Sequence, residues 1–291
     1  MSASGEVGKV RACVSIDVDP LGGDALWERA IPRHLALLAA ADLRATFFVV
    51  ASECARPIPR AWVRRIADAR HEIANHTLDH PRGFGRLARP ALVRQVADAE
   101  QMLQDAGGAR VVGFRAPAWD ATPELFDVLE QRGYVYDSSV CPTWVAPAAR
   151  IVGRPRRVRP FGALRFGLAP RVPYRPDARA PWRRGTMSLV EVPTSIGALR
   201  LPVWLTPVLA TGPRLDPAWR ALLRGTPAPQ WLFHAADLLD FECEVSPSLA
   251  YRPGLRRPLA QKEQLIGRAL ADLSRLGPAA GTVLEVARAL A

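Results

Sequence analysis

Residues 71–80, with the sequence HEIANHTLDH, place two histidines four positions apart at the end of a short, partly apolar segment. Histidines at this spacing, on one helical turn or in a tight loop, can reach one metal ion from the same side. A divalent metal needs at least one further ligand, usually a carboxylate, and Asp19 in the earlier segment SIDVDP (15–20) is a candidate. We therefore predict a metal site formed by Asp19, His76 and His80.

A histidine pair alone is a weak signal, because such pairs occur more often on solvated helix faces. Three neighbouring features favour the metal site. Asp17 and Asp19 follow an apolar run, GFRAPAW (113–119) follows another apolar step, and the late run WLF (231–233) ends at His234. The chain has 5 histidines, and four of them fall in these segments.

Short apolar segments alternate along the chain with segments that have apolar residues at helical spacing. We expect strands at 10–19, 44–50, 71–74, 111–114, 134–137, 188–193 and 230–234, and helices at 27–41, 60–69, 90–106, 122–131, 217–223, 261–276 and 282–291. Strands and helices that alternate with short connections are typical of parallel βαβ units. In such folds the active-site groups gather at the carboxyl ends of the strands, and each motif described above ends an expected strand.

The order of these motifs resembles the polysaccharide deacetylase family of carbohydrate esterases. The resemblance rests on Asp-x-Asp (17–19), HEIANHTLDH, Arg-x-Pro (115–117) and a late strand that ends in His234. It covers roughly residues 11–145 well and the last motif more loosely. It implies an α/β fold, a distorted and incomplete (β/α) barrel. Val18 separates the two aspartates, a variant that resembles the branch containing lipid-linked aminosugar deformylases and other intracellular amidases.

The resemblance also implies roles for single residues. Asp19, His76 and His80 hold a divalent metal, which the ligand types suggest is Zn²⁺, with Co²⁺, Ni²⁺ or Fe²⁺ as alternatives. Asp17 is the general base, and Arg115 holds it in place and keeps it ionised. His234 is the candidate general acid, since a histidine can hold and release a proton near neutral pH. Asp237 or Asp240 is the alternative, either as the acid or as a partner of this histidine.

The aromatic residues of these motifs have two interpretations. Phe114, Trp119 and Trp144, and with them Trp231, either form the walls of the acyl pocket or belong to the core. Asp137 either bonds a catalytic histidine or caps a turn. Asn75 and Thr77 are expected to orient the loop of the ligand pair, and His71 and His34 to have structural positions.

The chain has 291 residues, of which 49% are hydrophobic, enough for one large α/β domain or two small ones. We expect a single catalytic domain over 1–291, with an Arg/Pro-rich elaboration at about 145–187. Within it, residues 150–184 contain eleven arginines and six prolines. We expect this segment to form a long loop with short edge strands.

The formal net charge is +11, and only Lys9 and Lys262 of the 39 basic residues are lysines. A GC-rich genome would produce this arginine excess, yet arginine is also the better ligand for phosphate. An anionic membrane surface or a phosphorylated substrate fits this charge. No nucleic-acid-binding motif is present, so we expect no nucleic acid partner.

Features of the chain outside the motifs bear on its location. Its four cysteines are widely spaced and are expected to be reduced thiols. Residues 1–11 lack the apolar core of a secretory signal, and no run of eighteen apolar residues is present. These features favour a cytoplasmic protein, with a peripheral contact to the inner face of the membrane as an option.

The function expected from these features is the hydrolysis of an N-acyl group, acetyl or formyl, from an aminosugar. The substrate is lipid-linked or nucleotide-linked if the enzyme serves cell-envelope glycan biosynthesis. A non-sugar amidohydrolase of the same fold remains an alternative. A third alternative is a non-catalytic glycan-binding protein. The presence of all six residues with implied metal-binding or catalytic roles argues against it.

Overall fold

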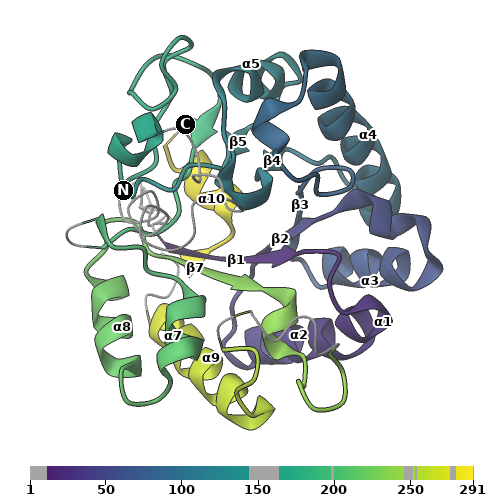
Figure 1. Ribbon diagram of the computed structural model, residues 1–291, viewed down its shortest axis with the longest axis vertical. Helices are drawn as coiled ribbons and strands as arrows, with labels where there is room; N and C mark the ends of the chain where they lie inside the picture. Colours follow the sequence, from purple (N-terminus) through teal and green to yellow (C-terminus); the bar gives the residue numbers. More distant parts are fainter. Residues whose placement is uncertain are drawn as a thin grey trace, which may run out of the picture.

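A parallel β-sheet occupies the centre of the computed structural model, which describes residues 12–143, 164–197, 200–245, 252, 254–275 and 280–290 (Figure 1). Its strand order is β6-β5-β4-β3-β2-β1-β7, and β8 pairs with the start of β1. The strands are β1 (Ala12–Val18), β2 (Thr46–Val49), β3 (Glu72–Asn75), β4 (Gly113–Phe114), β5 (Tyr136–Asp137), β6 (Val190–Glu191), β7 (Gln230–His234) and β8 (Ala280–Gly281). Every pairing within this sheet is parallel.

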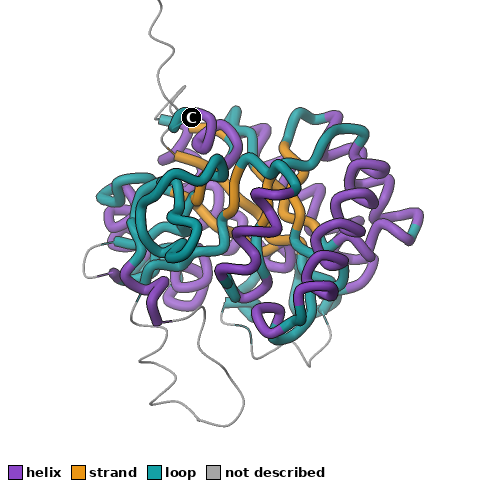
Figure 2. Tube along the Cα trace, turned by 90° about the horizontal axis from the view of Figure 1, so that it is seen from above, coloured by secondary structure: helices purple, strands orange, loops and turns teal. Residues whose placement is uncertain are grey.

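Helices surround the sheet on its outer side, as the view from above shows (Figure 2). They are α1 (Gly23–Ala25), α2 (Ile31–Ala40), α3 (Pro57–Asp68), α4 (Arg89–Gly107), α5 (Pro123–Gln131), α7 (Leu205–Thr211), α8 (Asp216–Arg224), α9 (Leu259–Ser274) and α10 (Val283–Arg288). Among the described residues no strand joins β6 to β7, so the sheet curves without closing. The distorted, incomplete (β/α) barrel expected from the sequence is therefore confirmed.

The strands form because their residues suit burial on both faces. All residues of β1 and β2 are buried, as expected for parallel strands covered by helices. Proline at the first helical position begins α3 and α5, where its missing N–H is not needed. Gly108, with a φ of 75°, ends α4 in the left-handed conformation.

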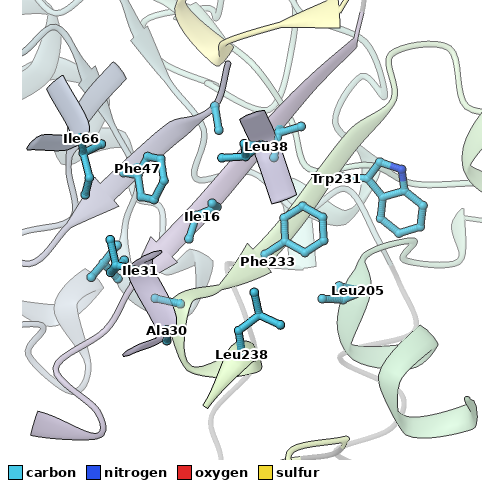
Figure 3. Close-up of a cluster of buried hydrophobic side chains, with 14 of the residues drawn as sticks. Ile16, Ala30, Ile31, Leu38, Phe47, Ile66, Leu205, Trp231, Phe233 and Leu238 are labelled. Atoms are coloured by element: carbon cyan, nitrogen blue, oxygen red, sulfur yellow. The ribbon is translucent and has the colours of Figure 1, made fainter. Parts of the chain in front are cut away.

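A large apolar cluster joins the first and last strands to the helices beside them (Figure 3). Ile16 of β1 and Phe47 of β2 lie in it with Phe233 of β7, whose ring stacks on that of Trp231 with centroids 6.3 Å apart. Segments from opposite ends of the chain thus share one core. This packing fixes the carboxyl ends of β1 and β7 side by side.

Most of the expected elements are present with shorter bounds. The helix expected at 27–41 begins as a π-helical turn at Leu26–Ala30 and continues as α2. The prediction missed α7, which contains Pro207, and β8, which directly precedes α10. In the expected elaboration, residues 144–163 lie outside the described residues, and the rest contains a 3₁₀ turn at Leu164–Leu168 and antiparallel bridges such as Tyr174↔Glu191.

Two further observations concern the whole described part of the chain. None of its helices combines the length and the apolar character needed to cross a membrane. The cysteines Cys13, Cys54, Cys141 and Cys243 all have free thiols.

Candidate active site

The candidate active site lies at the carboxyl ends of neighbouring strands. Asp17 and Asp19 come from the end of β1, and His234 is the last residue of β7, where it pairs in register with Asp17. His76 and Arg115 directly follow β3 and β4. Together with His80 these side chains line one cavity of about 350 Å³. The structure thus brings together all six residues that the sequence predicted for metal binding and catalysis.

The predicted metal ligands surround one point. Oδ1 of Asp19 lies 3.5 Å from Nε2 of His76 and 3.5 Å from Nε2 of His80. One ligand atom from each of the three residues can be chosen so that all lie within 4.8 Å of one another. One carboxylate oxygen and two imidazole nitrogens at this separation fit a divalent transition metal that keeps open positions.

The tautomer of His76 supports the same assignment. Its Nδ1 lies 2.8 Å from the carbonyl oxygen of Arg115, and a carbonyl can only accept a hydrogen bond. The proton of the neutral ring therefore resides on Nδ1, and the lone pair of Nε2 faces Asp19. A metal-binding histidine is commonly oriented in this way. When His76 is instead protonated on both nitrogens, its Nε2–H donates to Asp19. Burial opposes the charge of Asp19, but this hydrogen bond and the nearby histidines then hold the pKa of its carboxyl well below the usual range.

The histidine pair is presented by a tight loop and not by a helix. Thr77 and His80 have φ values of 73° and 56°, in the left-handed region. Oδ1 of Asn75 accepts the N–H of Thr77 at 2.8 Å, and the Thr77 hydroxyl accepts the N–H of His80 at 3.1 Å. Nδ2 of Asn75 donates to the carbonyl of Val96 at 3.0 Å. The hydrogen bonds of Asn75 and Thr77 thus offset the cost of this left-handed backbone, which places both histidines at the cavity.

Arg115 forms a buried ion pair with Asp17. Its Nη1 lies 2.6 Å from Oδ1 of Asp17, and the side chains are only 1% and 6% exposed. The guanidinium also donates to the hydroxyls of Ser15 and Ser138 at 3.1 and 2.9 Å and lies over the ring of Phe48. Such a fully bonded guanidinium holds Asp17 in one position.

His234 reaches the cavity from the neighbouring strand. Its backbone N–H donates to Oδ2 of Asp237 at 2.8 Å, which fixes the turn after β7. Asp237 lines the same cavity. His34, on α2, also contacts this turn, since its Nε2 lies 3.2 Å from the carbonyl oxygen of Ala235.

The aromatic residues are divided between the cavity and the core. Trp119 lines the cavity, and its ring packs against that of Trp204 with centroids 5.2 Å apart. Phe114 is fully buried against Phe84 and Tyr134, so the interpretation of Phe114 as a pocket wall is wrong. Successive side chains of a strand point to opposite sides, and Arg115 takes the inner one.

Of three other positions, one lies in the core, one is not described, and one has the structural position expected of it. Trp231 is fully buried in the apolar cluster of Figure 3 and does not line the cavity. Trp144 lies outside the described residues. His71 stands at the opposite end of the sheet, where its Nδ1 accepts the N–H of Ala45 at 3.2 Å.

Asp137 bonds no histidine among the described residues, so that interpretation is wrong as well. It pairs in register with Glu191 of β6, and both are fully buried. The Ser139 hydroxyl donates to Oδ1 of Asp137 at 2.5 Å. Burial raises the pKa of Asp137 to about 6, and burial and the negative charge of Asp137 raise that of Glu191 well above its usual range. Two adjacent buried carboxyls cannot both ionise readily, which is why burial and mutual repulsion act in the same direction here.

The sequence analysis missed three residues that line the cavity: Trp204, Thr206 and Arg252. None belongs to a periodic segment or to a motif. Asp237, named there beside His234, also lines the cavity, whereas Asp240 does not. Arg252 makes the closest contact with the metal ligands, since its Nη2 lies 3.3 Å from Oδ2 of Asp19.

Comparison with known proteins gives the same result as the motifs. Residues 13–136 match the sequence profile of the family described as polysaccharide deacetylase. A Mycobacterium smegmatis protein assigned to the polysaccharide deacetylases has a similar solved structure, with 17% identity, a TM-score of 0.60, and 96% of this chain and 90% of that chain covered.

Two further solved structures are similar. A CE4 family pseudoenzyme from Bacillus anthracis shares 15% identity at a TM-score of 0.54, covering 96% of this chain and 66% of its own. A peptidoglycan N-acetylglucosamine deacetylase also shares 15% identity at a TM-score of 0.54, covering 95% and 87%. At these identities the likeness shows the common fold. The stretch that matches the polysaccharide deacetylase family, residues 13–136, contains both aspartates, both predicted ligand histidines and Arg115.

Proposed function

We propose that this protein is a metal-dependent hydrolase that removes an acetyl or formyl group from the nitrogen of an aminosugar. The observation that carries the proposal is the buried Asp17–Arg115 pair, 2.6 Å apart, beside Asp19, His76 and His80. One structural relative is described as a pseudoenzyme, so the fold alone does not establish catalysis. The argument depends on these side chains.

Asp19, His76 and His80 would hold the metal, for which their ligand types favour Zn²⁺ over Co²⁺, Ni²⁺ or Fe²⁺. When bound, the metal supplies a Lewis acid and lowers the pKa of water. Asp17 then removes the proton from the attacking water, and Arg115 holds this carboxylate in position.

The remaining steps fall to residues on the other sides of the cavity. His234 donates a proton to the leaving amine. The backbone near Ala118 and Trp119 turns with φ values of 53° at both residues. The N–H of Trp119 is bonded to the carbonyl of Ala116 at 3.2 Å, so we assign the N–H of Ala118, a residue that lines the cavity, as the donor for the oxyanion. Trp119 and Trp204 form an aromatic wall on which a sugar ring can stack.

The substrate is an N-acyl aminosugar linked to a lipid or a nucleotide, and the protein acts in the cytoplasm, where it can contact the membrane surface. The net charge of +11 and the free thiols support this part of the proposal. An N-acyl amidohydrolase for non-sugar substrates is the second candidate. The narrow cavity of about 350 Å³ with two tryptophans favours a ring over an extended chain.

The test is the release of acetate or formate from a panel of N-acetyl and N-formyl aminosugars, free and lipid-linked, with N-acyl amino acids as the comparison. The protein is assayed after chelation and again after one equivalent of Zn²⁺ is returned. We expect activity on sugars only, lost on chelation and restored by metal. Equal activity before and after complete metal removal would refute metal dependence, and cleavage of amino acid amides alone would favour the second candidate.

A further inference from the structure

Arg252 extends into the active-site cavity but uses only part of its guanidinium there. Its Nη2 lies 3.3 Å from Oδ2 of Asp19, and the side chain is 21% exposed. Its Nη1 is buried and has no hydrogen-bond partner among the described residues. Buried polar groups nearly always have a partner, and a charged donor left without one is costly. This nitrogen therefore points to an acceptor supplied by a ligand.

The position of Arg252 is fixed by the segment that follows it. Leu255 is buried, and its N–H donates to the carbonyl of Arg252 at 3.3 Å. Gly254, with a φ of 80°, packs closely against Leu209 of α7. Lys262 of α9 is buried and donates through Nζ to the carbonyls of Leu239 at 2.5 Å and Leu255 at 3.2 Å. The turn after Arg252 is thus anchored to two helices.

The charges of the cavity favour an anion. Its lining includes three carboxylates, of Asp17, Asp19 and Asp237, and two guanidiniums, of Arg115 and Arg252. Arg115 is committed to Asp17. With a divalent cation on the ligand set, positive charge exceeds negative charge in the cavity, and Arg252 supplies the excess. A cavity with a net positive charge concentrates negatively charged ligands.

We propose that Arg252 binds an anionic oxygen group, a carboxylate or a phosphate, that the N-acyl aminosugar carries on the same sugar ring as the amide to be cleaved. This inference rests on the proposed function. One arm of the guanidinium contacts a predicted metal ligand, and the other has no partner among the described residues, while the residue itself lines the cavity. An anion bound by the second arm therefore lies close to the amide, because both arms belong to one rigid planar group.

The substrates for the test share one sugar and differ in charge. N-acetylglucosamine is neutral, N-acetylmuramic acid adds a carboxylate, and N-acetylglucosamine 1-phosphate adds a phosphate. The wild-type protein is compared with Arg252→Gln and Arg252→Lys, and with Arg94→Gln as a control that removes an equal charge from an exposed position on α4. The kinetic measure is kcat/KM for each substrate, and metal content is determined for every protein.

We expect the wild type to prefer an anionic sugar, and Arg252→Gln to lower that preference by about 10- to 100-fold, the usual effect of losing a charge-assisted hydrogen bond. Arg252→Lys should restore part of it, since lysine keeps the charge without the planar fork. Arg94→Gln should keep the preference. The charged sugar with the larger preference identifies carboxylate or phosphate as the group.

A second measurement is independent of turnover. Calorimetry with the metal-loaded Asp17→Asn protein, with and without Arg252→Gln, gives the Kd of each sugar. Tighter binding of an anionic sugar that disappears with Arg252→Gln supports the inference even if the wild type cleaves no sugar, an outcome that refutes only the proposed function. Equal losses for neutral and anionic sugars, no preference in the wild type, or loss of metal from Arg252→Gln would each overturn it.

Discussion

Nη1 of Arg115 lies 2.6 Å from Oδ1 of Asp17, and neither side chain is more than 6% exposed. The two residues come from strands that are not adjacent, since β3 and β2 separate β4 from β1. The pair therefore crosses the inside of the barrel and binds its two sides together. It lies beside the metal ligands, so it is both a structural link and a part of the proposed chemistry.

We propose that Asp17 is the general base and Asp19 a metal ligand, and substitution should separate these two roles. Asp17→Asn should lower turnover by roughly two to four orders of magnitude, the range for loss of a general base, while the protein keeps its metal. Asp19→Asn should lose metal affinity as well, because it removes a ligand. Turnover and metal content by mass spectrometry check both. Equal metal loss in the two variants would mean that Asp17 also coordinates.

Breaking the ion pair from the arginine side should affect stability. Arg115→Met leaves the Asp17 carboxylate buried without its partner, which costs about 3 to 5 kcal/mol in other buried pairs. We expect a fall of that size in the free energy of unfolding, measured by denaturant titration. The double variant Asp17→Asn/Arg115→Met removes both charges and should recover part of the loss. A double variant no more stable than Arg115→Met would show that packing on Phe48, and not the charge, dominates.

Glu72, at the start of β3, should make stability depend on pH. Burial raises its pKa to about 7, although the hydroxyls of Thr46 and Tyr136 donate to it. Its pKa is thus higher in the folded than in the unfolded state, so the folded protein binds more protons between pH 4.5 and 7. Stability from this residue is therefore present at low pH and is lost as the pH rises toward 7.

The free energy of unfolding should fall by about 3 kcal/mol at most because of Glu72, a limit set by the size of its pKa change. Glu72→Gln should remove this slope from the curve of unfolding free energy against pH. Glu28→Gln, at an exposed glutamate of the turn before α2, should leave the slope in place. Parallel curves for wild type and Glu72→Gln would mean that Glu72 stays ionised in the folded protein.

The sequence predicted most of this site because its residues stand at the ends of strands. Apolar runs marked the strands, and parallel pairing brought Asp17, His76, Arg115 and His234 to one edge. Phe114 was misplaced because β4 has two residues, too few to show which side faces the cavity. The alternation of polar and apolar residues shows which side of a strand faces inward only when the strand is longer.

The parts that could not be predicted depend on tertiary contacts. Arg252 contacts Asp19 across 233 positions of the chain, from a segment with no regular pattern. Asp137 and Glu191 each end a strand, but only the register of β5 with β6 reveals that they lie side by side. Trp204 meets Trp119 because α7, which the sequence did not indicate, carries it to the cavity.

The proposed role of His234 as the acid rests on its position beside Asp17, the proposed base. It pairs in register with Asp17 on the adjacent strand, and its turn is fixed by the bond of its N–H to Asp237. An amide needs a proton on its leaving nitrogen, whereas an activated ester such as a nitrophenyl acetate does not. His234→Gln keeps the approximate size of the side chain but cannot transfer a proton. It should lower amide turnover by about 10²- to 10⁴-fold, spare ester turnover and leave metal content intact. Stopped assays of both substrates on metal-loaded protein decide the matter, because equal losses for ester and amide would show that His234 positions the substrate and does not protonate it.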